Sequence, residues 1–502
     1  MNNKNFDLKK NLNLAHEYIG KKNFSGALKL YEKIIQIHPD NFEANMNLGI
    51  IFAQSNNLDK AIKLWEKAIE INPKEHGVYN NLGLTYVRIG KSDKAIKYLE
   101  LAIKLNPNDS NSFNNLGFAQ NQLKEYQKAK SNLLKAISIN PKNFMALYNL
   151  ANLYKKLNEI EKAEKYYNNV LKISPKFLNA YINLMDLYER SNQDLKLNEI
   201  IIKSQEHIKH DATIELFKGN LLFRSKKYSE VIEKLESIKF TNLINKDEII
   251  KEGSRTVTLA KCYDHIDNAD KAFQYFKITN EISFNSNKDI INKDKFVNII
   301  NKKINYFEKQ KKNEWPTTKL NNNEKDPTFL VGFPRSGTTL LDTILRSHPS
   351  VEVIEEKPII DEFIIQLHNK TKSNFDSLKI VDENLLNEMR NVYFNSRKKY
   401  VDEDKNKTYI DKMPLNIIYI AEILRIFPNA KFIISLRHPC DCVLSCFMQN
   451  FKLNEAMSNF LNLKDTALTY DLIMNLLKIY KSKFDFHFYE IKYEKLILNL
   501  ND

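Results

Sequence analysis

The sequence predicts a two-part fold of class α plus α/β: an N-terminal α-helical solenoid followed by an α/β domain with a parallel sheet. Three observations predict it. A 34-residue period runs through the first half, and glycine is scarce, at 11 of 502 residues. Near residue 327 the helical spacing gives way to alternating strands and helices. The length by itself predicts two or three domains.

The 34-residue period is carried by three series of residues in one register. Prolines stand at Pro39, Pro73, Pro107, Pro141 and Pro175. Small residues keep the same spacing at Ala15, Gly49, Gly83, Gly117 and Ala151, and again at Ala27, Ala61, Ala95, Ala129 and Ala163. Proline ends a helix because its ring clashes with the preceding turn, and small residues let two helices approach closely. The pattern resembles the tetratricopeptide repeat, whose helical hairpins stack into a superhelix.

The register weakens after the fifth repeat. Ala260 and Ala272 indicate a further hairpin that is out of phase. We therefore expect seven or eight hairpins over 8–285, within a first domain 1–285. Residues 286–326 are polar and rich in Lys and Asn, which predicts a helix followed by a linker. The resemblance implies a protein or peptide partner on the concave surface of the array, although a rigid spacer is the alternative.

Charge and composition narrow the possible partners. The net charge is +14, and residues 327–502 contain 23 Lys and Arg against 23 Asp and Glu, so the whole excess lies in 1–326. Since no nucleic-acid motif accompanies it, we predict a solvated basic face and no nucleic-acid partner. No run of 18 apolar residues is present, which predicts no membrane span. Few cysteines and a start without an apolar core predict a reducing cytoplasm.

An anion-binding loop begins the second part. Residues 328–331 form a short apolar run, 332–339 a loop with glycine, and 340–347 a segment with helical spacing. Backbone N–H groups converge at such a helix start and favour negative charge. The loop resembles a P-loop (Walker A), but Thr338 replaces its lysine, which argues against a kinase or another NTPase. Arg335 supplies a cation whose planar guanidinium suits a phosphosulfate.

The run Pro-Arg-Ser-Gly-Thr-Thr at 334–339, followed by His348 and Pro349, resembles the sulfotransferase family. The likeness covers about 327–500 and is greatest to bacterial tetratricopeptide-repeat and tyrosylprotein sulfotransferases. It implies that PAPS, 3′-phosphoadenosine 5′-phosphosulfate, is the sulfuryl donor, with no metal required. The loop residues that it implies for PAPS binding are Arg335, Ser336, Gly337, Thr338 and Thr339.

A second block supports the resemblance. A predicted helix at 415–427 precedes a predicted strand at 431–436, which ends at Arg437. Ser445 follows eight residues later on the next helix, so that both side chains could face one phosphate. The resemblance implies that this pair binds the 3′-phosphate of PAPS.

The catalytic candidates are two glutamates, a lysine and Arg335. Sulfuryl transfer requires that the acceptor hydroxyl lose a proton, and a carboxylate can take it. The resemblance implies a base at Glu355 or Glu356, with Glu356 favoured because the bacterial group also has the repeats. Lys412 matches a family lysine near the leaving group, and Arg335 adds charge at the phosphosulfate. Asp411 either orients Lys412 or is simply a capping residue.

The chain departs from the family near its end. The run Tyr-Glu-Lys-Leu at 493–496 resembles a late family segment, but the chain stops at Asp502. We therefore expect a sulfotransferase domain at 327–502 with a truncated C-terminus and uncertain activity. The main hypothesis is transfer to a hydroxyl, including a protein tyrosine. The alternative is a non-catalytic interaction protein with a degenerate nucleotide-binding domain. Cys440, Cys442 and Cys446 predict packing rather than a metal site.

Overall fold

The computed structural model of the chain describes residues 7–242, 245–316, 325–402, 404 and 406–498. Its contacts divide the chain into two compact units, Met1–Ser225 and Lys226–Asp502. The first unit is all helical, and the second contains a parallel sheet. This confirms the predicted fold class.

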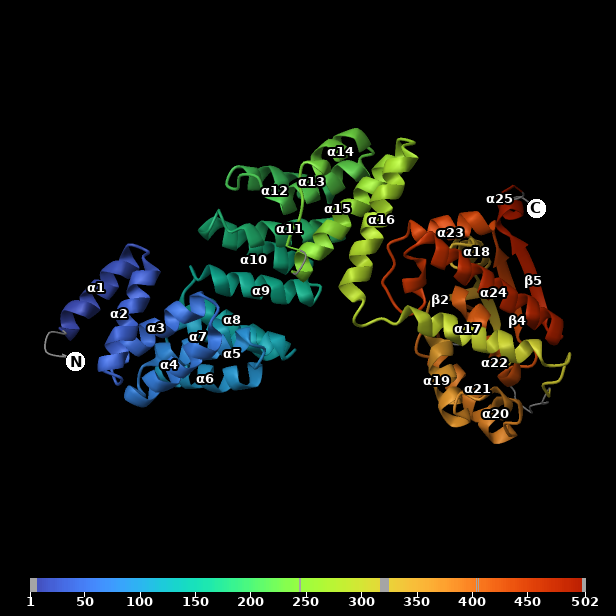
Figure 1. Cartoon of the computed structure of the whole chain (residues 1–502), viewed down its shortest axis with the longest axis horizontal. Helices are drawn as coiled ribbons and strands as arrows, with labels where there is room; N and C mark the ends of the chain where they lie inside the picture. The colour runs from blue at the N-terminus through green and yellow to red at the C-terminus, as the bar shows by residue number, and fades with distance from the viewer. Residues whose placement is uncertain (1–6, 243–244, 317–324, 403, 405, 499–502) are drawn as a thin grey trace. The chain divides into compact units, whose positions relative to one another are not determined.

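The first unit is a stack of helical hairpins (Figure 1). Its helices are α1 (Leu8–Gly20), α2 (Phe24–Ile37), α3 (Phe42–Gln54), α4 (Leu58–Ile71), α5 (His76–Arg88), α6 (Ser92–Leu105), α7 (Ser110–Gln122), α8 (Tyr126–Ile139), α9 (Phe144–Lys156), α10 (Ile160–Ile173), α11 (Leu178–Arg190), α12 (Asp194–Gln205) and α13 (Ala212–Arg224). Helices α1 to α12 pair in sequence order as six hairpins. Each of α2, α4, α6, α8 and α10 ends two residues before a proline of the 34-residue series.

The small residues of the repeat have the predicted physical role. A Cβ on Gly49 would lie 2.4 Å from Trp65 Nε1, and a Cβ on Gly83 would lie 2.6 Å from Leu99 Cγ. On Gly117 it would lie 2.7 Å from the Cγ of the leucine at the equivalent position of its hairpin. These separations leave no room for a side chain, so the two helices of each hairpin meet at the glycine.

The second unit begins with four more helices, α14 (Tyr228–Glu236), α15 (Lys246–His265), α16 (Ala269–Asn287) and α17 (Lys293–Glu308). Helices α15 and α16 form the predicted out-of-phase hairpin. All four belong to the same compact unit as the sheet. The domain boundaries expected at 285 and 326 rest on repeat register and composition, and they stay predictions.

The sheet has five parallel strands in the order β2-β3-β1-β4-β5. They are β1 (Thr328–Gly332), β2 (Val351–Glu355), β3 (Thr408–Lys412), β4 (Lys431–Leu436) and β5 (His487–Lys492). The strand predicted at 431–436 has the bounds of β4. The helix predicted at 415–427 is divided into a 3₁₀ helix, η1 (Pro414–Tyr419), and α22 (Ile420–Ile426).

The remaining helices cover the two faces of the sheet. They are α18 (Thr338–Arg346), α19 (Ile359–Thr371), α20 (Phe375–Lys379), α21 (Glu383–Arg397), α23 (Pro439–Phe447), η2 (Met457–Phe460), α24 (Leu463–Lys483) and α25 (Tyr493–Leu498). Side chains alternate along β1, so Leu330 packs with Leu341 of α18 on one face. Phe329 and Val331 join the larger core on the other face.

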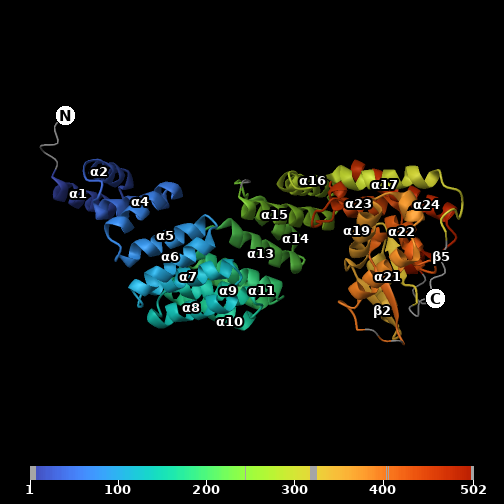
Figure 2. The same cartoon turned by 90° about the horizontal axis from the view of Figure 1, so that it is seen from below.

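Helix α17 is part of that larger core. It lies along α24 in both views (Figures 1 and 2). Lys303 of α17 is fully buried, pairs with the equally buried Glu422 of α22, and donates to the carbonyl of Ile418 at 2.9 Å. The helix predicted within 286–326 is therefore α17, and a buried charge pair anchors it. Of the linker predicted after it, residues 317–324 lie outside the described residues.

Candidate functional site

The predicted site residues gather at one edge of the sheet. Because all five strands are parallel, their carboxyl ends meet at that edge. After β1 the chain continues to β2 and β3, on one side of β1 in the sheet. After β4 it continues to β5, on the other side. The direction of the connections therefore reverses between the neighbouring strands β1 and β4. Ligands of open α/β sheets bind at such a switch point. The loop after β1 and the start of α23 after β4 flank it.

The loop between β1 and α18 has an unusual backbone. Arg335 and Gly337 both have positive φ, of 69° and 98°. A Cβ on Gly337 would lie 2.4 Å from Tyr493 Cδ2, and one on Gly332 would lie 2.7 Å from the Ser435 carbonyl oxygen. Only glycine fits both places without displacing a neighbour. The sequence Gly-Phe-Pro-Arg-Ser-Gly therefore folds the loop tightly over the ends of β1 and β4.

The loop is joined to the β4–α23 segment by hydrogen bonds. Arg335 Nε donates to Ser445 Oγ at 3.0 Å, and Arg437 Nη1 donates to the Arg335 carbonyl at 3.4 Å. The Ser435 hydroxyl donates to the Ser336 carbonyl at 2.8 Å. The structure thus brings together three of the residues predicted for cofactor binding, Arg335, Arg437 and Ser445, although about a hundred residues separate the first from the others.

These three residues line one cavity of about 340 Å³. Its other lining residues come from α15, α16, α23 and the residues just after α23: Lys261, Asp264, Phe276, Asp441, Leu444, Met448 and Gln449. Three cations and two carboxylates therefore face the cavity, beside an apolar wall. This charge balance suits an anionic ligand with an apolar part.

Two buried polar atoms at this edge lack a partner among the described residues. They are Ser336 Oγ, in a residue that is 1% exposed, and Arg437 Nε. Arg437 Nη2 lies 3.4 Å from Asp441 Oδ2, and the Arg437 guanidinium lies 4.6 Å from the centre of the Tyr493 ring. A buried donor without an acceptor is unfavourable. A phosphate or sulfate oxygen would supply one, so the residues present fit the phosphate and sulfate groups that the resemblance implies.

The remaining loop residues lie at the start of α18. Thr338 is buried and Thr339 is exposed in its first turn, and the Thr339 carbonyl accepts from the Thr343 hydroxyl at 2.9 Å. The N–H groups of this turn point toward the loop, as at any helix N-terminus. The Cys446 thiol donates to the Pro334 carbonyl at 3.4 Å, which ties α23 to the loop.

Three of the four predicted catalytic residues form a second cluster at the same edge, whereas the fourth, Arg335, lines the cavity. Lys412, the last residue of β3, is fully buried, and its Nζ lies 2.7 Å from Glu356 Oε1 and 3.2 Å from Glu355 Oε1. Glu355 and Lys412 are paired in register across β2 and β3. Glu355 also lies 3.5 Å from Arg346 Nη2. Since β3 and β4 flank β1, this cluster and the cavity lie on opposite sides of the β1 loop.

Glu356 is held in a left-handed conformation, with φ of 49°. Its N–H donates to the Lys412 carbonyl at 2.8 Å, and its side chain is 54% exposed. A left-handed non-glycine residue carries strain that the surroundings must compensate. The turn after β2 thus directs an accessible carboxylate toward a buried ammonium, which is a suitable arrangement for a general base.

Asp411 does not orient Lys412. Adjacent strand residues project from opposite faces, so its carboxylate enters the core beside Tyr393 of α21. Burial raises the pKa of Asp411 to about 7, and the nearby hydroxyl of Tyr393 offsets part of this shift. The Asp411 oxygens also accept no backbone N–H among the described residues, so both interpretations of Asp411 from sequence, orientation of the lysine or a cap, are wrong.

Sequence reasoning gave no role to two features of the site. Tyr493 and Glu494 were noted only as a family likeness, yet the tyrosine ring stacks on Arg437 and Glu494 Oε1 accepts from the His438 N–H at 2.8 Å. The wall from α15 and α16 was also missed. Its signal is absent from local sequence, because it depends on packing between segments over 150 residues apart.

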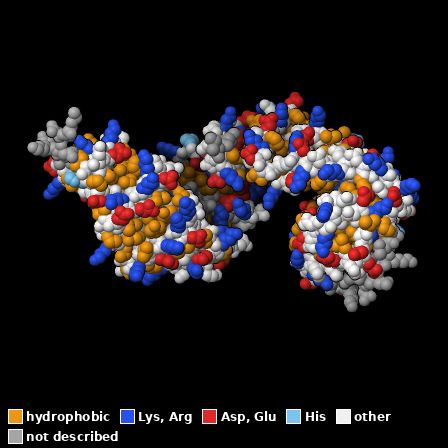
Figure 3. Space-filling view, turned by 60° about the horizontal axis from the view of Figure 1, so that its bottom comes forward, with side chains coloured by type: hydrophobic (Ala, Val, Ile, Leu, Met, Phe, Trp, Pro, Cys, Tyr) orange, Lys and Arg blue, Asp and Glu red, His pale blue; other side chains and the backbone are white. Residues whose placement is uncertain are grey.

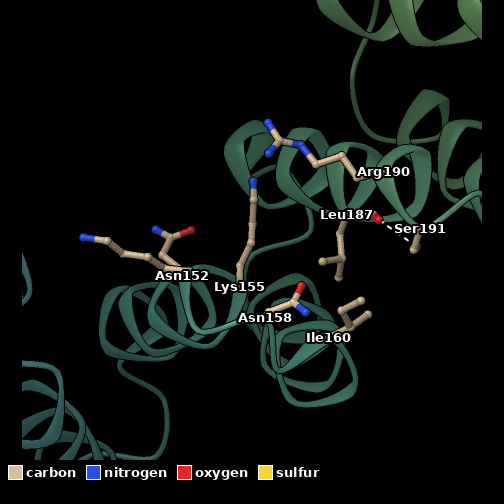
Figure 4. Close-up of a pocket in the computed structure, with 8 residues that line it drawn as sticks. Asn152, Lys155, Asn158, Ile160, Leu187, Arg190 and Ser191 are labelled. Carbon is tan, nitrogen blue, oxygen red and sulfur yellow. Dashed lines mark hydrogen bonds between the residues drawn. The ribbon is translucent and has the colours of Figure 1, made fainter. Parts of the chain in front are cut away.

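The repeat unit has a cavity of its own, of about 530 Å³, between the ends of α9 and α11. Figure 4 shows Lys155 extending from α9 toward Arg190 of α11. Both cations contact Asp186, at 2.7 and 2.8 Å. Lys155 and Arg190 lie in the last turns of their helices, where cations complement the helix dipole. Their charge therefore has an adequate structural role without a ligand.

Surface charge is mixed rather than segregated. On the face seen in Figure 3, Lys and Arg side chains are interspersed with Asp and Glu. Within the described ranges, no group of three or more His, Cys, Asp or Glu side chains is arranged to hold a metal. In the same residues, no helix combines the length and apolar character that crossing a bilayer requires.

Comparison with known proteins agrees with this architecture. The model of the sulfotransferase family matches residues 327–502. Tetratricopeptide-repeat models match four stretches of the first unit, at 49–90, 77–109, 98–131 and 144–177. The resemblance predicted from 334–339 and from the 34-residue period is confirmed at the level of these domains.

Individual relatives match shorter stretches. An uncharacterised protein of Aquifex aeolicus is 32% identical over 27% of this chain and 18% of its own length. The protein-tyrosine sulfotransferase of Drosophila melanogaster is 29% identical over 23% of this chain and 24% of its own length. The chain thus spans less than a third of these relatives. A tetratricopeptide-repeat protein from Parabacteroides merdae, of known structure, has 18% identity and a TM-score of 0.40, and the match covers 49% of this chain and 98% of that one.

Proposed function

We propose that this chain, in which tetratricopeptide repeats precede a sulfotransferase-family domain, transfers a sulfuryl group from PAPS to a hydroxyl acceptor. The observation that carries the proposal is the convergence of Arg335, Arg437 and Ser445 on one cavity at the switch point of the sheet. A lysine-free loop with a guanidinium in it suits a phosphosulfate better than a nucleoside triphosphate.

The loop between β1 and α18, together with Arg437 and α23, would bind PAPS. The N–H groups of Ser336, Gly337, Thr338 and Thr339, with Arg335, would hold the 5′-phosphosulfate, and Arg437 and Ser445 would hold the 3′-phosphate. PAPS would supply the sulfuryl group. The unpartnered Ser336 Oγ and Arg437 Nε support this assignment because each has an unused hydrogen bond.

Glu356 would remove the proton of the acceptor hydroxyl, with Glu355 as the alternative base. Glu356 is favoured because Lys412 is its only ion-pair partner among the described residues, whereas Glu355 is shared between Lys412 and Arg346. Lys412, fully buried, would place positive charge where negative charge develops on the leaving oxygen. The acceptor, including a protein tyrosine, belongs to this proposal.

The repeat array would present a protein or peptide partner, which supports a macromolecular acceptor. Location in the cytoplasm stays a prediction that rests on the low cysteine content.

One titration distinguishes an enzyme from a non-catalytic scaffold. The full chain should bind 3′,5′-adenosine bisphosphate at least tenfold more tightly than ADP, and Arg437→Ala should abolish the difference. Equal or absent binding of the two nucleotides would favour the scaffold with a degenerate nucleotide site.

A transfer assay then identifies the base. Tyrosine-containing peptides and simple phenols serve as acceptors with labelled PAPS. We expect Glu356→Gln to lower the rate by about 10²–10⁴-fold, and Glu355→Gln to lower it less. The reverse order would move the base to Glu355.

A further inference from the structure

We infer that Lys261, on helix α15 of the hairpin before the sulfotransferase-family domain, is a ligand for the 3′-phosphate of the nucleotide. The inference rests on the proposed function and deepens it. Lys261 lies outside the stretch that matches the sulfotransferase model, 327–502. It lines the same cavity as Arg437 and Ser445, the residues proposed for that phosphate.

The hairpin is fixed against the site by buried contacts. Asn280 of α16 is 6% exposed, and its Nδ2 donates to the Phe447 carbonyl at 2.9 Å. The Phe273 and Phe447 rings stack with centroids 5.2 Å apart, and Phe276 meets the same ring edge-on at 6.5 Å. Phe447 is the last residue of α23. The helix that carries Ser445 therefore rests directly on α16.

The hairpin is also rigid within itself. Thr279 of α16 donates to the Thr256 hydroxyl of α15 at 2.8 Å in a buried contact. Arg255 of α15 is buried and forms a two-pronged pair with Glu252, one turn away. Lys261 therefore projects from a rigid scaffold, as a binding residue requires.

Charge at the cavity favours an anion at this place. Arg437 is partly neutralised by Asp441, at 3.4 Å. Lys261 is exposed and makes no ion pair within the described part of the chain. Lys261 and Arg437 line the same cavity, and their like charges repel, so an anion bound between them would be stabilised by both. Asp264, three residues along α15, lines the same cavity and limits the excess of positive charge.

The test compares two nucleotides that differ only in the 3′-phosphate. The full chain is titrated calorimetrically with 3′,5′-adenosine bisphosphate and with 5′-AMP. We expect Lys261→Ala to weaken bisphosphate binding about five- to twentyfold and to leave AMP binding within twofold. Asp264→Asn should tighten bisphosphate binding. Lys277→Ala, on α16 and outside the cavity lining, is the matched control and should match the unaltered chain.

The outcomes separate this inference from the function on which it rests. If the unaltered chain prefers the bisphosphate and Lys261→Ala binds it equally well, the inference is wrong and the function stands. If Lys261→Ala weakens both nucleotides equally, the lysine does not read the 3′-phosphate. If the unaltered chain shows no preference for the bisphosphate over AMP, both the proposed function and the inference are overturned.

Discussion

At the scale of single residues, the site depends on charges in places where an isolated charge is costly. Lys412 is fully buried and Asp411, its neighbour in β3, is 1% exposed, but they face opposite sides of the sheet. Lys412 has two carboxylates near its Nζ, whereas Asp411 oxygens lack a hydrogen-bond partner in the described residues. Strand β3 thus places the paired charge of Lys412 at the site and the carboxyl group of Asp411 in the core, where its protonated form is favoured.

Lys412→Ala should impair transfer far more than nucleotide binding. Without the ammonium, no buried positive charge faces the leaving oxygen, so we expect a rate lower by about 10²–10³-fold. Bisphosphate affinity should change less than threefold. Lys407→Ala is the control, because Lys407 lies just before β3 and pairs with Glu352 at 2.7 Å near the surface. An unchanged rate in Lys412→Ala would remove the lysine from the mechanism.

Asp411→Asn should change the pH dependence of stability. Burial raises the pKa of Asp411 from 3.8 to about 7. Between these values the folded chain keeps a proton that the unfolded chain has lost, so this group's contribution to stability falls as pH rises toward 7. Asparagine does not ionise, so the variant loses no stability from this cause as pH rises. In urea unfolding, its free energy of unfolding relative to the unaltered chain should therefore increase from pH 5 to pH 8, by roughly 1–3 kcal/mol.

The surface variant Asp471→Asn should keep the pH dependence of the unaltered chain. If Asp411→Asn lowers stability equally at both pH values, the ionised carboxylate makes a favourable contact in the core, and the raised pKa does not govern its stability.

At the scale of elements, the sequence predicted the structures that nearby residues determine and missed the contacts that distant residues determine. Strand 431–436 follows from a short apolar run and was predicted with its observed bounds. The helix after the glycine loop was predicted from residue 340, and α18 begins two residues earlier, at Thr338. The repeat hairpins follow from a period that local packing enforces. Helix α17 was predicted as a helix, but its anchoring through Lys303 was not, because Glu422 lies 119 residues away. A polar composition cannot reveal a buried partner that distant.

Gly337→Ala should disable the loop between β1 and α18. The left-handed conformation costs an alanine about 1–2 kcal/mol, and the new Cβ would displace the Tyr493 ring that stacks on Arg437. We expect bisphosphate binding to weaken at least tenfold by calorimetry. Gly253→Ala is the control, because a methyl group on Gly253, inside helix α15, would have no neighbouring atom within 4 Å. Equal effects of the two changes would contradict the loop geometry.

The buried pair between α17 and α22 should be stabilising only as a pair. Lys303→Met leaves Glu422 charged and without its ammonium, which should cost about 3–5 kcal/mol in chemical denaturation. The double change Lys303→Met with Glu422→Leu should recover most of that loss, since neither side chain then needs a partner. A single variant as stable as the unaltered chain would mean that His368, 3.6 Å from Glu422, compensates alone.

At the scale of the whole chain, the match to the sulfotransferase family begins at a later residue than the compact unit that contains the sheet. The family model starts at 327, but the unit that contains the sheet starts at Lys226. The difference comprises α14 to α17, which supply the buried Lys303 and one wall of the cavity that Arg335, Arg437 and Ser445 line. Family likeness identifies the stretch with shared sequence, whereas stability depends on every helix that covers the core.

Two shortened chains should therefore behave differently. A chain of residues 226–502 keeps Lys303, Asn280 and Lys261, so we expect cooperative unfolding and bisphosphate affinity within about threefold of the full chain. A chain of 327–502 leaves Glu422 buried without its ammonium and exposes the core face that α17 covers. It should be insoluble or lack a cooperative transition in circular dichroism. If it instead folds and binds the bisphosphate as tightly as residues 226–502 do, then α14 to α17 are dispensable, and the role proposed for Lys261 would be overturned with them.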